Sequence, residues 1–464
     1  MKTRETKKQQ KTDVILSEAT DGINRVRLMG TARAEEEEEC PWKEIDAYSG
    51  RFVVAGYKYD DVGGTTDNYH PWLAYSTDGG EKWIPSTTTS DEDQTHGELQ
   101  ALTYGGGHFV VAGYRYGTSG GTTDNNHPWL AYSTDGGKTW TKSETTANED
   151  QTHGYLYALA YGGGRFVVAG YQYGSGSGTR DDNHPWIAYS TDGGKTWTKS
   201  ETTANEDQPH GHLRALAYGG GRFVVAGYRY GSSGDTANNY HPWLAYSSDG
   251  GETWTPSTTT SDEDQTHGQL YALAYGGGRF VVAGYQYGTD NNHPWIAYST
   301  DGGKTWTKSE TTADKDQTHG RLYALAYGGG RFVVAGYRYD NVDDTTDNYH
   351  PWLAYSTDGG EKWIPSTTTS DTSQTHGLLY ALAYGGGRFV VAGYQYGSGS
   401  GSGTRDDYHP WIAYSSDGGD TWTPSTTTGA NESQSHGELH ALTYAPDSYC
   451  WQFGTEKEDE DEEN

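Results

Sequence analysis

Tyrosine, tryptophan and histidine recur together along this chain of 464 residues, at the same three places in each of seven near-copies of one segment. In one copy, Tyr173 ends an apolar run, Trp186 follows a His-Pro pair, and His153 precedes a glycine. An aromatic ring can pack against the apolar face of a sugar, while neighbouring acids and amides bind its hydroxyl groups. The pattern therefore favours carbohydrate binding.

The candidate ligand-binding residues are the members of these three sets. They are Tyr59, Tyr116, Tyr173, Tyr230, Tyr287, Tyr339 and Tyr396; Trp72, Trp129, Trp186, Trp243, Trp295, Trp352 and Trp411; and His96, His153, His210, His267, His319, His376 and His436. Two of the sets also have a structural interpretation. The tryptophans can fill the space between packed sheets, and the histidines can satisfy backbone groups of a turn. Both interpretations stay open on the sequence alone.

Metal binding is a further possibility, because an acidic residue lies three positions before several of these histidines, as Asp150 does before His153. Two copies carry Ser373 and Ser433 at the acidic position, and no cysteine joins any set. Structural zinc sites are almost always completed by four protein ligands. We therefore expect no metal site and no other cofactor.

The repeat that carries these residues has a period of about 57 residues. The segment Arg51–Tyr57 returns at residues 108, 165, 222, 279, 331 and 388, with His108 once in place of arginine. One unit, residues 156–200, reads as four short strands joined by glycine-rich turns. Its second strand, 165–171, is apolar without alternation, which is typical of a strand covered on both faces. The pattern predicts an all-β protein, a closed β-propeller of four-stranded antiparallel blades.

A second motif joins the third and fourth strands of each unit. In one copy it is Ser190-Thr191-Asp192-Gly193-Gly194-Lys195-Thr196-Trp197, and it recurs from Ser76, Ser133, Ser247, Ser299, Ser356 and Ser415. This motif resembles the Asp-box (BNR) repeat of sialidase-like propellers. The resemblance implies a structural hairpin, in which the Asp accepts backbone N–H bonds and the Trp is buried. The residues concerned are Asp78, Trp83, Asp135, Trp140, Asp192, Trp197, Asp249, Trp254, Asp301, Trp306, Asp358, Trp363, Asp417 and Trp422.

The resemblance to sialidases covers the expected fold and the Asp box, and it does not extend to the catalytic residues. Those enzymes need an arginine cluster, a Tyr–Glu nucleophile pair and an acid/base Asp, each from a different blade. Blades that hardly differ do not supply such an asymmetric set, so we expect no catalytic residue and a protein that is not an enzyme. The leading hypothesis is a non-catalytic, multivalent glycan-binding propeller. A protein-interaction scaffold is the alternative, and a sialidase-like glycoside hydrolase is a third.

Ring closure determines the number of blades. Residues 439–444 read as another first strand and 448–453 as a second strand, while residues 15–26 resemble a third strand with a decayed Asp box. We therefore expect an eighth blade shared between the two ends of the chain, with seven blades as the alternative. The expected propeller domain is 13–454, between disordered segments 1–12 and 455–464.

Strand direction divides the turns between two rims. The glycine turns and Asp boxes share one rim, so the longer loops between strands two and three and between strands four and one share the other. Loops on a rigid scaffold commonly carry binding sites. We expect the ligand, a glycan or a protein, to bind on the rim formed by these longer loops.

A net charge of −30 makes nucleic acid an unfavourable partner. No segment reaches transmembrane length and no secretory signal is readable, so we expect no membrane insertion and a cytoplasmic monomer by default. The two cysteines, Cys40 and Cys450, do not make a disulfide scaffold, and we expect free thiols.

Overall fold

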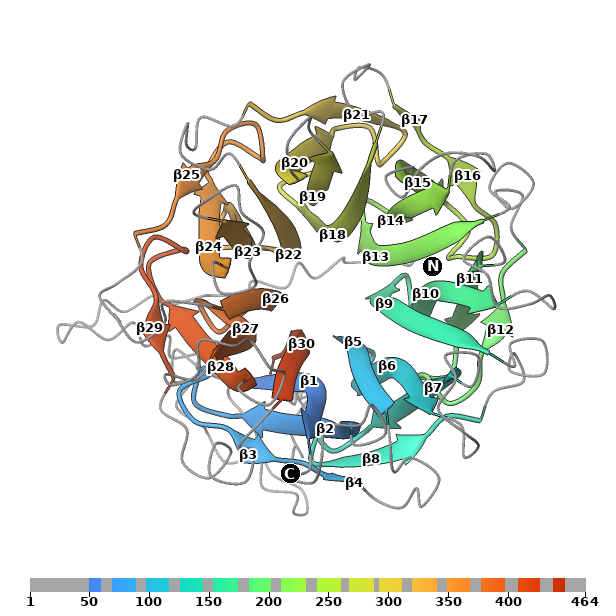
Figure 1. Cartoon of the computed structure of the whole chain (residues 1–464). Helices are drawn as coiled ribbons and strands as arrows, with labels where there is room; N and C mark the ends of the chain where they lie inside the picture. The colour runs from blue at the N-terminus through green and yellow to red at the C-terminus, as the bar shows by residue number, and fades with distance from the viewer. Residues whose placement is uncertain are drawn as a thin grey trace, which may run out of the picture.

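The computed structural model describes residues 50–59, 69–88, 97–116, 126–144, 153–173, 183–201, 210–230, 240–259, 267–287, 292–310, 319–339, 349–367, 377–396, 408–425 and 437–446. These segments form a ring of seven β-sheets around a central axis (Figure 1). Each sheet is one blade with four antiparallel strands, so the all-β propeller expected from the repeat is confirmed. No helix in this part of the chain could span a membrane.

Strands of the same kind occupy the same place in every blade. The first, innermost strands are β5 (Gly97–Gly105), β9 (Gly154–Gly162), β13 (Gly211–Gly219), β18 (Gly268–Gly276), β22 (Gly320–Gly328), β26 (Gly377–Gly385) and β30 (Gly437–Ala445). The second strands are β1 (Arg51–Tyr59), β6 (His108–Tyr116), β10 (Arg165–Tyr173), β14 (Arg222–Tyr230), β19 (Arg279–Tyr287), β23 (Arg331–Tyr339) and β27 (Arg388–Tyr396).

The outer half of each blade is built in the same way. The third strands are β2 (Tyr69–Ser76), β7 (Asn126–Ser133), β11 (Asn183–Ser190), β15 (Tyr240–Ser247), β20 (Asn292–Ser299), β24 (Tyr349–Ser356) and β28 (Tyr408–Ser415). The fourth strands are β3 (Ile84–Pro85), β8 (Thr139–Lys142), β12 (Thr198–Lys199), β16 (Thr255–Pro256), β21 (Thr305–Lys308), β25 (Ile364–Pro365) and β29 (Thr423–Pro424). Two further short strands, β4 (Thr87–Thr88) and β17 (Thr258–Thr259), pair in parallel with the fourth strand of the next blade.

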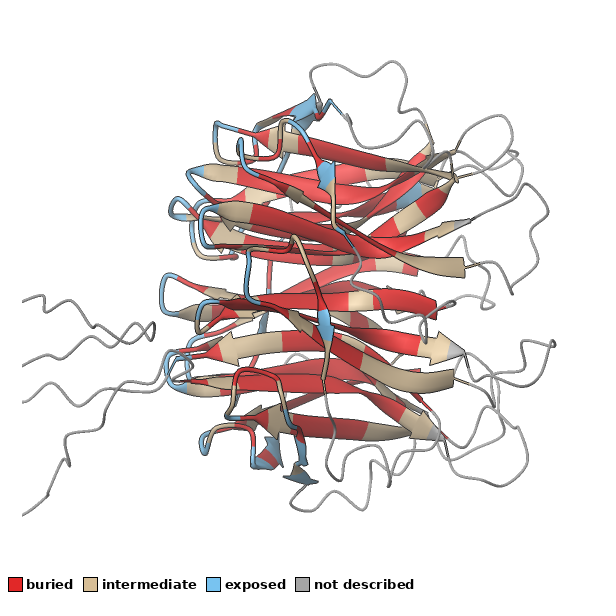
Figure 2. Ribbon diagram, turned by 90° about the vertical axis from the view of Figure 1, so that its left-hand side faces the viewer, coloured by how far each residue is buried: buried red, intermediate tan, exposed pale blue. Residues whose placement is uncertain are grey.

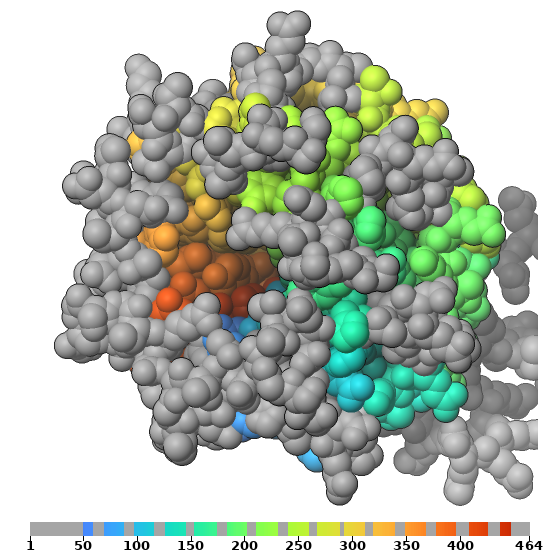
Figure 3. All heavy atoms as spheres, turned by 45° about the vertical axis from the view of Figure 1, so that its right-hand side comes forward, coloured from blue at the N-terminus to red at the C-terminus, as the bar shows by residue number. Residues whose placement is uncertain are grey.

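The expectation of an eighth blade is wrong, because the last described strand completes the first blade. Strand β30 pairs with β1, so that Arg51 lies opposite Ala445 and Val54 opposite Leu442, and the sheet order is β3-β2-β1-β30. In Figure 3 the red surface of the last described segments lies beside the blue surface of the first ones. Residues 15–26 and 448–453, which were expected to form the rest of the eighth blade, lie outside the described residues.

A belt of hydrogen bonds also closes the ring. The serine that follows each fourth strand donates its hydroxyl to a glycine carbonyl in the Asp box of the next blade, as Ser143 does to Gly194 at 2.6 Å. The same bond joins the last blade to the first, from Ser425 to Gly80 at 2.7 Å. With β30 in the first blade, each of the seven blades packs between two others, and each inner strand that the structure describes is paired with a second strand. This pairing protects the sheet edge at the seam.

The core lies between the blades rather than within any one of them. A typical cluster joins Val167 and Ile187 of one blade to Phe223, Trp243 and Trp254 of the next. Buried residues continue through all the sheets, whereas exposed residues gather in the tight turns at one side of the disc (Figure 2). This two-sided burial explains why the second strands are apolar without alternation.

Candidate functional site

Each innermost strand contains a β-bulge at the same position. The pairing of β13 with β14 skips one residue between Leu213 and Ala215, so Arg214 is the extra residue. A bulge changes the direction of a side chain. The seven bulged residues are Gln100, Tyr157, Arg214, Tyr271, Tyr323, Tyr380 and His440. All seven line one central cavity.

A glycine in the second strand makes each bulge possible. A Cβ atom on Gly227 would lie 2.0 Å from the backbone oxygen of His212, and one on Gly113 would lie 2.0 Å from that of Glu98. Backbone atoms cannot move away as a flexible side chain can, so only glycine fits opposite the bulge. The glycine in the repeated Val-Val-Ala-Gly-Tyr segment therefore supports the residue that faces the axis.

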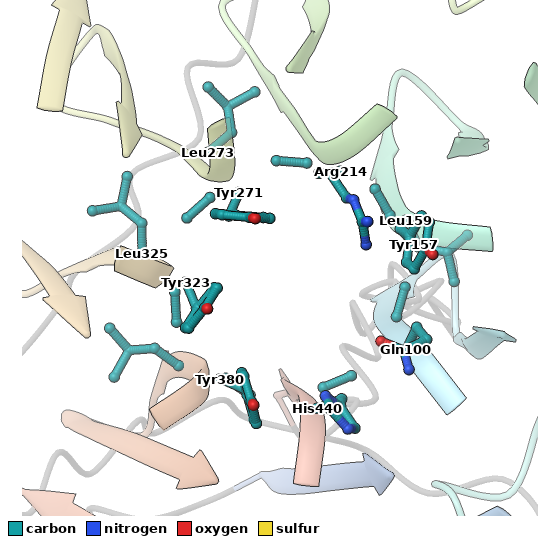
Figure 4. A pocket seen from close by; sticks show the side chains of 18 of the residues that line it. Gln100, Tyr157, Leu159, Arg214, Tyr271, Leu273, Tyr323, Leu325, Tyr380 and His440 are labelled. Carbon is teal, nitrogen blue, oxygen red and sulfur yellow. The ribbon is translucent and has the colours of Figure 1, made fainter. Parts of the chain in front are cut away.

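The central cavity is narrow. Its volume is about 150 Å³, and alanine and leucine side chains of the inner strands, such as Ala215 and Leu216, form part of its wall. Arg214, Tyr271, Tyr323 and His440 point from separate inner strands toward the same hollow (Figure 4). Typical ligand pockets enclose roughly 300–1,000 Å³. The cavity can therefore accept one end of a ligand, and the remainder would lie at its opening.

A second set of variable residues precedes the bulged residues by two positions. The set comprises Glu98, Tyr155, His212, Gln269, Arg321, Leu378 and Glu438. We call the two sets together the channel mouth; of the two, the bulged residues line the cavity. Members of the two sets contact each other: Gln100 donates to Glu98 at 2.8 Å, and Tyr271 donates to Gln269 at 2.6 Å. His440 Nε2 lies 3.3 Å from Glu438 Oε2.

Two arginines make one arc of the channel mouth cationic. The Arg214 guanidinium lies 3.8 Å from the ring centroid of Tyr157 and 6.0 Å from that of Tyr271. Arg321 lies 4.6 Å from the ring centroid of Tyr285. Cations over aromatic faces are attracted by the ring quadrupole. The Nε atom of Arg214 is buried and has no hydrogen-bond partner among the described residues.

Burial controls the protonation of these groups. It raises the pKa of Tyr157 to about 12, although the neighbouring Arg214 acts in the opposite direction. Burial, and then the neighbouring Tyr323, also raise the pKa of Tyr271 above its ordinary value. For Arg214, burial lowers the pKa, but the surrounding tyrosines outweigh it and the pKa is raised. Near neutral pH the tyrosines are therefore neutral and the arginines are charged.

The opposite arc is acidic. Glu98 in β5 and Glu438 in β30 lie on neighbouring inner strands, and Glu438 is buried. Arg214 and Arg321 lie in β13 and β22, with β18 between them. The channel mouth is thus polarised, with cationic and acidic arcs on different blades.

Those candidate tyrosines whose side chains the structure describes lie close to the channel mouth. Tyr230 lies 3.1 Å from the ring nitrogen of His212, a residue of the mouth. Tyr173 is 3.3 Å from Tyr171, and Tyr287 is 3.1 Å from Tyr285, through their hydroxyl groups. Tyr59, Tyr116, Tyr339 and Tyr396 end their strands, and their side chains lie outside the described residues.

The candidate tryptophans are mostly core residues. Trp186 is 1% exposed and packs with Phe166 and Trp197 between two blades. Trp72, Trp129, Trp243, Trp295 and Trp352 are also buried, and Trp411 is half-buried against such a cluster. The structure therefore places six of these seven side chains where a sugar on the rim could not reach them.

The candidate histidines lie at the start of the inner strands. His153, His210, His267 and His319 are half-buried, and each packs against a histidine of the preceding blade. His96, His376 and His436 lie outside the described residues. No group of three or more His, Cys, Asp or Glu side chains in the described ranges is arranged to hold a metal ion.

The Asp boxes form closed hydrogen-bond networks on the other rim. Asp192 accepts bonds from the Ser190 hydroxyl at 2.8 Å and from the Thr196 amide at 2.9 Å, and Trp197 donates to Gly194 at 3.2 Å. Partial burial by itself raises the pKa of Asp192, but these bonds outweigh it, and the pKa is lowered. The pKa values of Asp135, Asp249, Asp301, Asp358 and Asp417 are lowered in the same way.

The residues of the channel mouth were missed by the sequence reasoning, which concentrated on what the blades share. The signal in the sequence was variation and not similarity, because two positions of the first strand change from copy to copy in blades that are otherwise nearly identical. His212 and Arg214 in one blade correspond to Glu98 and Gln100 in another. The expectation that no asymmetric set of residues exists therefore overlooked these positions.

Comparisons with known proteins agree with this fold. A family model described as "BNR repeat-like domain" matches residues 162–372, and one described as "BNR/Asp-box repeat" matches residues 131–142. A curated protein from Paraclostridium sordellii, named "Sialidase", is 26% identical over 211 residues, which cover 40% of this chain and 51% of that protein. The chain thus spans about half the length of this relative.

Solved structures that match part of this chain include Trypanosoma rangeli sialidase in complex with 2,3-difluorosialic acid. It is 13% identical with a TM-score of 0.43, and the match covers 72% of this chain and 57% of that one. A protein of unknown function from Dyadobacter fermentans is 17% identical with a TM-score of 0.44, over 75% of this chain and 94% of that one.

Proposed function

We propose that this chain, a BNR/Asp-box-repeat β-propeller with a sialidase-type fold, binds carbohydrate at its channel mouth without cleaving it. The observation that carries the proposal is the ring of bulged residues. In an array of nearly copied blades, the positions that meet at the axis differ, and they combine tyrosines with charged and amide side chains. This is the combination that binds a sugar ring and its hydroxyl groups.

The cationic arc favours a sugar that carries a carboxylate. Arg214 lines the cavity, and Arg321 lies two blades away on the same arc. Arginine is well suited to carboxylates because its donors form a planar fork. The curated relative is named a sialidase, and sialic acids are sugars of this class. A cavity of about 150 Å³ is large enough for a carboxylate end.

The carboxyl and phenol groups of the channel mouth are poorly suited to catalysing the hydrolysis of a glycoside. Glycosidases of most families need one carboxyl group as an acid and a second nucleophile or base beside the scissile bond. Glu98 is held by Gln100 and Glu438 lies beside His440. Burial raises the pKa values of Tyr157 and Tyr271, which keeps these phenols protonated and weakens them as nucleophiles. These features favour binding over catalysis.

A site on the axis changes the expected stoichiometry. Seven equivalent rim sites would bind several ligands per chain, whereas a single mouth shared by all blades binds one. The longer loops of the rim lie largely outside the described residues. The proposal therefore assigns one principal sugar site to the ring.

Titration calorimetry with N-acetylneuraminic acid and with neutral galactose tests the proposal. We expect one equivalent of the acidic sugar to bind, and Arg214→Tyr combined with Arg321→Gln to weaken binding at least about tenfold, since a charged hydrogen bond contributes roughly 1.5–3 kcal/mol. Other copies carry Tyr and Gln at these positions, so the variant should fold. Lys195→Glu, an exchange at the Asp-box rim that matches other copies, is the control.

Three results would contradict the proposal. Absence of binding at about 10 mM sugar, ten times a weak Kd of about 1 mM, would exclude the site. Binding of several equivalents, unaffected by the arginine exchanges, would locate the ligand on the rim. Release of sialic acid from a glycoside under the same conditions would show an enzyme.

A further inference from the structure

Pairs of histidines bridge neighbouring blades on the side opposite the Asp boxes. One histidine lies in the third strand of a blade, and the other immediately precedes the innermost strand of the next blade. The ring centroids are separated by 4.9 Å for His127 and His153, 5.2 Å for His184 and His210, 5.0 Å for His241 and His267, and 5.3 Å for His293 and His319. All eight side chains are half-buried, so solvent reaches them.

This separation agrees with two imidazoles that share one metal ion. Two imidazole nitrogens bound at about 2.05 Å to a tetrahedral Zn²⁺ place the ring centroids about 5.2 Å apart. Imidazole suits first-row metal ions such as Zn²⁺, Cu²⁺ and Ni²⁺. The four pairs differ from this value by at most 0.3 Å.

The backbone holds both histidines of a pair in position. His184 lies in β11, paired with Gln172 of β10. The carbonyl oxygen of His210 accepts a hydrogen bond from the Tyr230 amide at 3.2 Å, which ties this residue to its own blade. A metal ion bound between the two side chains would therefore link two blades.

The residue opposite the third-strand histidine distinguishes two kinds of pair. Gln172 lies opposite His184, and Gln286 lies opposite His293. In both glutamines Oε1 is buried and has no hydrogen-bond partner among the described residues. Directly opposed residues of an antiparallel pair point to the same face of the sheet. Each glutamine thus lies on the same face of its sheet as the third-strand histidine of its pair.

The other two pairs carry a cation at this place. Arg115 lies opposite His127, and Arg229 lies opposite His241. A guanidinium so close to the site repels a metal ion. Two of these four histidine pairs thus have a neighbour that favours metal binding, and the other two have a neighbour that opposes it.

We propose that His184 and His210 with Gln172, and His293 and His319 with Gln286, are binding sites for a first-row transition-metal ion of the Zn²⁺ type. Each site supplies two imidazoles and one amide oxygen, and water completes the coordination. The described residues contain no group of three or more His, Cys, Asp or Glu ligands, so the affinity is modest. This inference is independent of the proposed sugar site.

Titration of the untagged full-length chain with ZnCl₂, followed by calorimetry in a buffer that does not chelate metal, tests the sites. We expect at least two equivalents to bind, and His184→Gln combined with His293→Gln to remove two of them. His108→Gln is the matched control, because His108 is a single histidine on the Asp-box rim, 2.9 Å from the Gly106 carbonyl oxygen. Thermal melting without metal verifies that each variant is folded.

Arg115→Gln provides a gain-of-function test. It converts the pair of His127 and His153 into the favourable kind, and we expect it to add one equivalent or to tighten that site about tenfold through removal of one positive charge. The proposal is overturned if the parent chain binds no Zn²⁺ at about 1 mM, the Kd of a very weak site. It is also overturned if the double histidine variant binds as many ions as the parent.

Discussion

The Asp boxes and the bulged residues both occur once in each blade, yet the Ser, Asp and Trp of the box are the same in all seven copies and the bulged residue varies. In every Asp box a serine donates to the aspartate and a buried tryptophan donates to a glycine carbonyl, as in Ser133, Asp135 and Trp140. At the bulge the copies carry Gln, Tyr, Arg or His. Among the described residues, each Asp box contacts its own blade and the preceding one, as when Gly194 accepts a hydrogen bond from Ser143, so every copy serves the same structural role. The bulged residues surround one cavity, so different copies can contribute different groups to one site.

The difference separates stability from ligand recognition. Changes in the Asp-box rim should alter the free energy of unfolding and leave ligand affinity unchanged. Replacing a channel-mouth residue by its counterpart from another copy should alter ligand affinity and leave the free energy of unfolding unchanged. A variant that altered both quantities would weaken this separation.

Removal of the closing strand should have the largest effect. A chain ending at residue 436 lacks β30, which leaves the inner edge of β1 unpaired and removes the buried Leu439 and Leu442. Burial of these two side chains alone contributes roughly 4 kcal/mol. We expect loss of a cooperative thermal transition, measured by circular dichroism.

A chain ending at residue 446 is the control for this truncation. It keeps β30 and the complete sheet of the first blade, so we expect its transition to remain cooperative. Equal melting of the two truncated chains would mean that β30 does not close the ring.

Loss of a single Asp-box tryptophan should have the next largest effect. Trp197 is fully buried between two blades, so Trp197→Ala should destabilise the chain by about 3–5 kcal/mol. Trp197→Phe keeps most of the packing and loses the bond to Gly194, at a cost of about 1 kcal/mol. Urea unfolding measures both values. If the folded Trp197→Phe variant bound sugar more weakly than the parent, the Asp-box rim would affect ligand affinity as well as stability, contrary to this separation.

Acid should weaken the Asp boxes gradually. Hydrogen bonding lowers the pKa of Asp192 in the folded chain below its value in the unfolded chain. The stabilisation is therefore present above about pH 4, near the unfolded pKa, and is lost as the pH falls through the folded pKa. We expect the melting temperature to decline below about pH 4 and Asp192→Asn to make that decline less steep. An identical pH profile in the variant would argue against this contribution.

The local parts of the fold were predictable because neighbouring residues determine them. Gly193 and Gly194 have φ values of 83° and 86°, a backbone conformation that glycine adopts readily, and the adjoining Asp and Trp satisfy the turn. The strands, the antiparallel blade and the Asp box followed from such patterns. The placement of Trp186 could not be decided locally, because the same residue could fill an interface or face a ligand until its neighbour blade was known.

The sequence by itself determined the blade, since the period, the glycine turns and the apolar strands act within one copy. Tertiary structure decided the number of blades, because residues 439–444 could begin a new blade or complete the first one. Closure by β30 depends on how seven sheets pack around an axis, which no single copy encodes. The same packing decided that Arg214 and Tyr323, from different copies, line one cavity. Each copy of the repeat supplies some residues of that site, and only the closed ring brings the residues of different copies together.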